Sequence, residues 1–358
     1  MFLSFIIAFF SLISLLILHE LGHFIFAKKF GVKVEEFGIF YPPRIFAKKI
    51  GETIYSLNLL PLGAFVKMHE TKDEKDSRAF GAKSFWQRAL IILGGVLSFW
   101  LISAILFSIV MGLGFSQAIT DEVNENLTGV KVQIVQVLSN SPAENVGLIV
   151  GDSIKQITIN NQQLTINKIK EVQEFISAHQ GEEIVLTIER GKDILDVPLT
   201  PRVSPPEDEG PMGVALVRTA QKKYPFGKAL LEGILITLKT TYFALAGWGM
   251  ALKNLFLGVP TGVELTGPVG IFSLLSQAAS YNISYFLQFV ATISIYIALC
   301  NALPIPLTDG GKLLFLSIEE LRGKKIPERL ENTINSIFLF LLIALMILIT
   351  IKDIKRIF

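Results

Sequence analysis

The 358-residue sequence has a single cysteine, Cys300, and only four histidines. One cysteine excludes an intrachain disulfide and a cysteine-based metal site. The net charge of +2 is small and no basic run is interleaved with aromatic residues, so no nucleic-acid partner is expected. Charged residues make up 18% of the chain against 51% hydrophobic residues, and the mean hydropathy is +0.52. The composition therefore indicates a membrane protein with a water-soluble part.

Long stretches without charge predict the membrane spans, because a helix needs about 20 apolar residues to cross a bilayer core of roughly 30 Å. We expect about four transmembrane helices, over about residues 2–27, 88–121, 285–303 and 332–351. The third is preceded at 265–280 by a Gly- and Ser-containing stretch, which predicts a broken or loop-led entry into the span. A signal peptide is the competing interpretation of the N-terminus. No Lys or Arg precedes the apolar run and no small-residue cleavage site follows it, so we favour a span.

The chain changes character between the second and third spans. Residues 130–135 and 184–188 alternate as strands, and 168–180 has the pattern of an amphipathic helix, so we expect a compact soluble domain that ends at the Pro- and acid-rich segment 205–210. Between Lys239 and Lys253 only 13 residues are uncharged, too few to span comfortably, which predicts an interfacial or partly embedded helix within 225–258. The expected divisions are an N-terminal membrane region, the soluble domain, a linker and a C-terminal membrane region, at residues 1–115, 116–220, 221–284 and 285–358.

Basic residues predict the orientation of the spans. Segments 28–88 and 306–332 carry the excess of Lys and Arg, which places both on the cytoplasmic side. The N-terminus, the soluble domain and the C-terminus then lie outside. The basic tail at 352–356 argues the other way, and either an odd number of spans or a tucked-in tail would explain it.

The motif His19-Glu20-Leu21-Gly22-His23 lies at the end of the first apolar run. Histidines at positions i and i+4 share one face of a helix and can bind one ion, with the intervening glutamate near enough for proton transfer. Zn²⁺ suits two imidazoles and a carboxylate, with a fourth position left for water. The plain alternative is a polar helix end at the membrane surface. Because a carboxylate at membrane depth costs roughly 2.5–3.5 kcal/mol on insertion scales, we favour a functional metal site.

A two-histidine site needs a third protein ligand, and Asp309 is the candidate. It ends the 44-residue uncharged run 265–308, in the sequence Asn301-Ala-Leu-Pro-Ile-Pro-Leu-Thr-Asp309-Gly-Gly. The prolines at 304 and 306 remove backbone donors, and they predict irregular backbone of the kind tolerated at membrane depth only where it lines an enclosed site. On its own, the segment would equally suit the ragged end of a span.

Together these motifs resemble the intramembrane site-2 protease metalloproteases, specifically the bacterial RseP type. Segments 61–68 and 265–270 resemble the family's membrane-associated β-loop and the stretch before its third span, and 116–220 is similar to its extracytoplasmic PDZ domain. The resemblance implies a polytopic α-helical membrane protein with this β-loop and one inserted PDZ-like α+β domain, placed in the bacterial cytoplasmic membrane with its active site toward the cytoplasm. It implies zinc bound by His19, His23 and Asp309, with Glu20 as general base. Asn301 matches a substrate-contacting asparagine, although a helix hydrogen bond is the alternative role.

Two features depart from the family pattern. Relatives usually have Gly-Pro-x-x-Asn in the second span, where this chain has Gly95-Val-Leu-Ser98-Phe99, so an asparagine is absent and Ser98 is a weak substitute. Larger relatives carry two tandem PDZ domains, whereas 116–220 has room for one.

The implied activity is proteolysis of single-span membrane proteins, such as an anti-sigma factor, a membrane-tethered regulator or a remnant signal peptide, in contact with membrane lipids. The PDZ-like domain would bind peptide termini by strand addition, or would exclude large ectodomains from the site. The β-loop around 53–68 would hold an unwound substrate as an added strand. A zinc transporter is disfavoured because the spans elsewhere lack histidine. An inactive scaffold is disfavoured because both histidines, Glu20 and Asp309 are all present.

Overall fold

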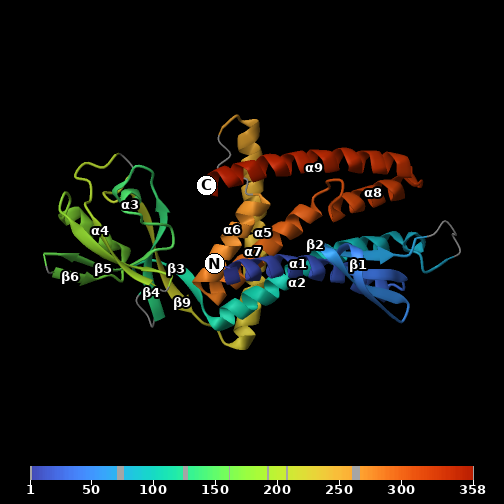
Figure 1. Cartoon of the computed structure of the whole chain (residues 1–358), viewed down its shortest axis with the longest axis horizontal. Coiled ribbons are helices and arrows are strands. Elements are labelled where there is room, and N and C mark those ends of the chain that lie inside the picture. Colours follow the sequence, from blue (N-terminus) through green and yellow to red (C-terminus); the bar gives the residue numbers. More distant parts are fainter. Residues whose placement is uncertain are drawn as a thin grey trace. The chain divides into compact units, whose positions relative to one another are not determined.

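The computed structural model describes residues 2–70, 76–123, 128–160, 162–191, 193–206, 209–259 and 267–357 (Figure 1). The chain divides into two compact units. The first contains Met1–Ile109, Leu230–Ala279 and Phe286–Phe358, and the second contains Val110–Ala229 with Ser280–Tyr285. The second unit is therefore largely an insertion between two membrane-type parts of the first.

Five helices among the described residues are long and apolar enough to cross a membrane. They are α1 (Phe2–Lys29), α2 (Phe85–Leu113), α5 (Phe226–Phe256), α7 (Ile283–Ala302) and α9 (Glu328–Ile357). Four of them fall where the charge-free runs predict spans. The shorter apolar helix α6 (Pro268–Tyr281) precedes α7, as expected for a broken entry. Of the resembling stretch 265–270, the first two residues lie outside the described part.

The fifth helix, α5, corrects one expectation from the sequence. Its 31 residues are enough to span, so the prediction of a segment too short to cross was wrong about length. The prediction counted only the uncharged residues between Lys239 and Lys253, whereas helix α5 continues through both lysines. Within the first unit α5 packs on α2 and α7 through an apolar cluster that includes Ala244 of α5, Phe107 of α2 and Ile295 of α7.

Helices α1, α2 and α7 pack around a second apolar cluster, in which Leu15, Phe99 and Ala298 are buried. Two serines join α2 to α7: Ser103 Oγ donates to the carbonyl oxygen of Ala291 at 2.8 Å, and Ser294 Oγ donates to that of Phe99 at 2.9 Å. A hydroxyl group that donates to a carbonyl of a neighbouring helix has a hydrogen-bond partner without water, which the bilayer core does not supply.

A two-stranded β-hairpin follows α1, formed by β1 (Val34–Ile50) and β2 (Thr53–Met68). Both strands are long and bend, so that residues 53–58 of β2 pair with 44–50 of β1, and residues 64–68 pair with 34–39. The far part of the hairpin exposes Ile45, Phe46, Leu59 and Leu62. Exposed apolar side chains in this number suit contact with a membrane, as the predicted β-loop requires.

The second unit is a sheet domain with strand order β3-β9-β4-β5-β7-β8, and β6 pairs with β5. Its strands are β3 (Phe115–Ile119), β4 (Thr128–Val137), β5 (Ser153–Ile159), β6 (Gln162–Thr165), β7 (Ile184–Arg190), β8 (Asp193–Leu199) and β9 (Val214–Lys222). The predicted strands at 130–135 and 184–188 correspond to β4 and β7. The short helix α3 (Pro142–Asn145) and the amphipathic α4 (Ile169–Ala178) complete the domain, and α4 confirms the predicted helix.

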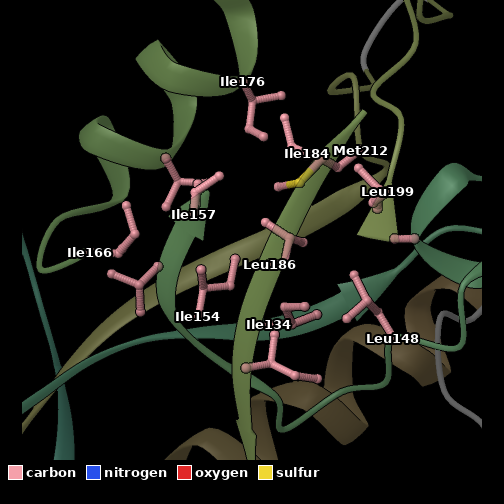
Figure 2. Packing of buried hydrophobic residues seen from close by; sticks show 14 of the residues in the cluster. Ile134, Leu148, Ile154, Ile157, Ile166, Ile176, Ile184, Leu186, Leu199 and Met212 are labelled. Carbon is pink, nitrogen blue, oxygen red and sulfur yellow. The ribbon is translucent and has the colours of Figure 1, made fainter. Parts of the chain in front are cut away.

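Alternating apolar residues of these strands form the core of the domain. Figure 2 shows Ile134, Ile154, Ile157 and Leu186 converging beneath Ile176 of α4. All of them are at most 3% exposed. Every second residue of the strands is buried, and α4 has one apolar face. These two sequence patterns therefore explain how the domain forms its core. Residues 207 and 208 of the expected closing segment lie outside the described part.

Candidate active site and metal centre

His19 and His23 lie one turn apart on α1, and both are buried, with 8% and 6% of their surface exposed. Asp309 is the first residue of helix α8 (Asp309–Arg322) and is 3% exposed. Together they form the group of His, Cys, Asp or Glu side chains that could hold a metal among the described residues. The structure thus brings together the three ligands that the sequence predicts.

The distances fit a tetrahedral ion. Asp309 Oδ2 lies 3.3 Å from His19 Nε2 and 3.3 Å from His23 Nε2, and the two imidazole nitrogens are also 3.3 Å apart. Ligand atoms about 2.0–2.1 Å from a tetrahedral zinc ion are separated by roughly 3.3–3.4 Å. Asp309 Oδ2 is buried without a hydrogen-bond partner, which is expected of an atom whose partner is a metal. The donor set and its spacing therefore fit Zn²⁺.

Neighbouring groups orient two of the ligands. His23 Nδ1 lies 2.8 Å from the carbonyl oxygen of Ile91, so its N–H donates there and Nε2 keeps its lone pair toward the ligand cluster. Lys312 Nζ donates to the other oxygen of Asp309, Oδ1, at 3.1 Å. This leaves Asp309 Oδ2 for the metal.

The ring of His19 stacks on Phe99 of α2, with centroids 4.7 Å apart and planes inclined by 22°. Phe99 is fully buried, in the segment 95–99 that departs from the family pattern expected from the sequence. Ser98, the weak substitute suggested by the sequence, donates its Oγ hydrogen to the carbonyl oxygen of Gly95 in its own helix at 2.6 Å. Aromatic packing replaces the expected polar group here.

Glycines allow the backbone to approach the site closely. A Cβ on Gly95 would lie 2.3 Å from His23 Nε2 and 2.5 Å from His19 Cε1, so only glycine lets α2 lie against both imidazoles. Gly310 and Gly311 follow Asp309, and a Cβ on either would lie 2.1–2.3 Å from carbonyl oxygens of the preceding loop. That loop is closed by Thr308, which caps α8 by accepting a hydrogen bond from the Gly311 N–H.

Glu20 is half-buried and lines a cavity of about 800 Å³ together with His23 and Asp309. Val66 and Met68 of β2 form part of the same wall. The edge of residues 64–68 that faces away from β1 has no strand partner among the described residues. A strand edge without a second strand therefore borders the cavity that contains the proposed base.

Asn301 does not line this cavity. Its Nδ2 donates to the carbonyl oxygen of Ile297, one turn back in α7, at 3.0 Å. This is the helix hydrogen bond that the sequence left open as its alternative role. Conversely, Arg88 and Asn335 line the cavity but were not identified as site residues from the sequence. In the sequence, Arg88 marks only the start of the second predicted span. An arginine beside an uncharged run is, however, a feature that could have indicated a site residue.

Apolar helices of spanning length, together with a buried His-His-Asp cluster beside a glutamate, define an intramembrane zinc metalloprotease. The model of Peptidase family M50 matches residues 5–345. A Clostridium perfringens protein that bears the name of a zinc metalloprotease is 34% identical over 346 residues, 95% of each chain. The zinc metalloprotease RasP of Geobacillus kaustophilus is 28% identical, covering 99% of this chain and 98% of its own. The regulator of sigma-W protease RasP of Bacillus subtilis is 27% identical over the whole of both chains.

The chain therefore belongs to Peptidase family M50, among the RseP-type site-2 proteases. It is a multi-pass bacterial membrane protein with zinc as its cofactor.

Proposed function

We propose that this protein cleaves single-span membrane proteins within or near the bilayer, with zinc held by His19, His23 and Asp309 and with Glu20 as general base. The observation that carries the proposal is the triangle of ligand atoms at 3.3 Å beside the Glu20 cavity. When bound, the zinc ion supplies Lewis-acid chemistry, since it makes a water molecule acidic near neutral pH and polarises the scissile carbonyl. Glu20 accepts the proton of the attacking water and returns it to the departing amine.

An extended substrate strand suits this site. A helical substrate keeps its amides within its own hydrogen bonds, so it must unwind before a carbonyl reaches the metal. The free edge of residues 64–68 offers main-chain partners to such a segment next to Glu20. Asn301 keeps its proposed role as a substrate contact, because its amide has a second N–H and a carbonyl oxygen besides the N–H that donates to Ile297.

Basic residues support a cytoplasmic position for the site in the bacterial inner membrane. Lys and Arg gather in 28–88, which follows the ligand-bearing helix α1, and in 306–332, which contains the ligand-bearing helix α8. In Figure 1 the part of α5 that belongs to the first unit runs across the direction of α1 and α2. If α1 and α2 cross the bilayer, a crosswise apolar helix lies along its surface, which supports the interfacial location proposed for α5.

The sheet domain has a groove suited to a peptide terminus. A hollow of about 400 Å³ lies between α4 and the start of β9, lined by apolar residues that include Val172, Ile176 and Leu216. Because β3 pairs only with 218–222 of β9, residues 214–217 have no strand partner on that edge within the described part of the chain. This supports a PDZ-like role in binding peptide termini by strand addition. Exclusion of large ectodomains remains the alternative role of the domain.

The Bacillus subtilis relative is named as a regulator of sigma-W, which supports regulated proteolysis of a single-span anti-sigma factor as the activity of this chain. Membrane-tethered regulators and remnant signal peptides have the same single-span form. A catalytically inactive scaffold is the second candidate, and the presence of Glu20 with all three ligands weighs against it.

The test is cleavage of a single-span reporter by purified protein in lipid vesicles, with product masses mapping the cleaved bond. Wild type is expected to cleave within or beside the apolar segment. Glu20→Gln is expected to lose activity by at least about 100-fold, as general acid–base catalysis contributes. Asp309→Ala is expected to lose activity because it removes a metal ligand. Equal product from all three proteins would refute the protease function.

A further inference from the structure

Two buried polar atoms without hydrogen-bond partners, in addition to the metal ligand, belong to residues that line the active-site cavity. Among the described residues, only six buried side-chain N or O atoms have no partner, and Asp309 Oδ2, Arg88 Nε and Asn335 Oδ1 belong to residues that line this cavity. The missing partner of Asp309 Oδ2 is the metal. Arg88 Nε and Asn335 Oδ1 also need hydrogen-bond partners, because a buried polar group left unpaired costs about 1–3 kcal/mol.

Arg88 lies in the first turn of α2, and its side chain is only 15% exposed. Its nearest acids are Glu319 and Glu320 of α8, but the closest nitrogen–oxygen distances are 4.0 and 3.9 Å. Both exceed hydrogen-bonding distance, so α8 balances the charge of Arg88 without filling its five donors. The guanidinium therefore has donors available toward the cavity.

Asn335 lies in α9, on another wall of the same cavity. Its unpaired atom is an acceptor, whereas that of Arg88 is a donor. Five glutamates and Asp309 line the cavity, against three basic residues, so the acidic excess disfavours a negatively charged ligand there. The basic residues are Arg88, Lys312 and Lys325. The ligand that offers both a neutral acceptor and a donor, at short intervals along an extended segment, is a peptide main chain.

We propose that Arg88 and Asn335 form a main-chain binding subsite for the substrate. Arg88 donates to a backbone carbonyl oxygen and Asn335 Oδ1 accepts from a backbone N–H, in the part of the substrate that lies in the cavity beside Glu20. The subsite rests on the proposed function, since it requires that the cavity bind an unwound peptide. The subsite binds backbone groups that every peptide has. It therefore contributes to substrate affinity and to the position of the peptide in the site, and it does not select particular side chains.

The test uses a fluorescent synthetic single-span peptide that the wild type cleaves. Its affinity is measured in the Glu20→Gln background, where binding is separated from catalysis. Arg88→Met, which keeps the apolar stem, is expected to weaken binding about 10- to 100-fold, and the near-isosteric Asn335→Leu about 2- to 10-fold. The matched controls are Arg329→Met and Asn332→Leu, exposed residues of α9 that do not line the cavity, and these are expected to bind as the parent does.

A second measurement addresses the main chain directly and does not depend on comparing the stability of variants. Peptides with one amide replaced by an ester, which weakens the carbonyl acceptor, are expected to bind the parent less tightly at one position. In Arg88→Met that same ester is expected to cause no further loss. Ester penalties unchanged by Arg88→Met at every position, or affinities of both cavity variants within about twofold of the parent, would overturn the subsite while leaving the protease function intact. Failure of the wild type to cleave any of the single-span peptides tested would overturn the protease function itself.

Discussion

Gly22 of α1 and Gly94 of α2 touch backbone to backbone. A Cβ on Gly22 would lie 2.2 Å from the Gly94 carbonyl oxygen, and one on Gly94 would lie 2.7 Å from Phe26 Cδ2. Gly22 stands between the two histidine ligands, so this backbone contact between the helices lies at the metal site. The glycine of the motif is thus set by helix packing, while its histidines are set by chemistry.

Gly22→Ala is expected to separate α1 from α2 and to reduce both zinc binding and activity. Overpacking of this kind costs about 1–3 kcal/mol, and here the obstacle is backbone, which cannot rotate away. The control is Gly247→Ala in α5, where nothing lies within 4 Å of the added Cβ and helix propensity favours alanine. Zinc content and thermal unfolding measured for both variants check the prediction. A Gly22→Ala protein with wild-type values would contradict the close contact.

Asp152 is expected to be the most sensitive polar residue of the sheet domain. It is fully buried, accepts 2.8 Å bonds from Arg190 Nε and Nη2, and accepts a third from the Ile149 N–H. Removal of one partner from a buried pair costs about 3–5 kcal/mol. Asp152→Ala should therefore make the domain sensitive to limited proteolysis, whereas Asp196→Ala, an exposed acid of β8, should not. Equal resistance of the two variants would show that the pair contributes little.

His69 is expected to make the base of the β-hairpin pH-dependent. Its ring lies 2.9 Å from Glu35 Oε1 and 2.9 Å from Asp76 Oδ2, and hydrogen bonds to Glu35 and then Asp76 raise its pKa above the ordinary value of 6.5. A raised folded-state pKa stabilises the fold fully below about 6.5, and this contribution disappears as pH rises through the higher folded pKa. An NMR titration should place the His69 pKa above 6.5. In Glu35→Gln it should fall, and an unshifted value in both proteins would contradict the contacts.

Chelation of zinc is expected to lower the unfolding temperature as well as the activity, because an ion that binds only the folded protein stabilises it by mass action. Added Zn²⁺ should restore both. The control is His19→Ala, which lacks a ligand and should unfold at a temperature that a chelator does not change. Identical unfolding curves of the wild type with and without chelator would argue against a bound structural role for the ion.

Some of these features were predictable from sequence because they rest on local periodicity. The i, i+4 spacing put His19 and His23 on one helix face, and the break at the prolines before Asp309 pointed to an enclosed loop. The alternation of β4 and β7 likewise predicted the sheet domain. In each case, neighbours in sequence determine the geometry.

Other features depend on contacts between distant segments, and these were missed. Charge-free counting shortened α5 because it treats Lys239 as an end, although a lysine can extend its charge away while the helix continues. The bent pairing of β1 with β2 and the stacking of Phe99 on His19 have no local signature. Arg88 and Asn335 converge from helices almost 250 residues apart, which periodicity does not reveal.

The most direct test of the account is the zinc content of purified wild type, Glu20→Gln and Asp309→Ala, measured by mass spectrometry of the metal. The account predicts about one zinc per chain for wild type and for Glu20→Gln, because Glu20 is a base and not a ligand, and a large loss for Asp309→Ala. Full zinc occupancy in Asp309→Ala, or loss of zinc in Glu20→Gln, would contradict the assignment of the site.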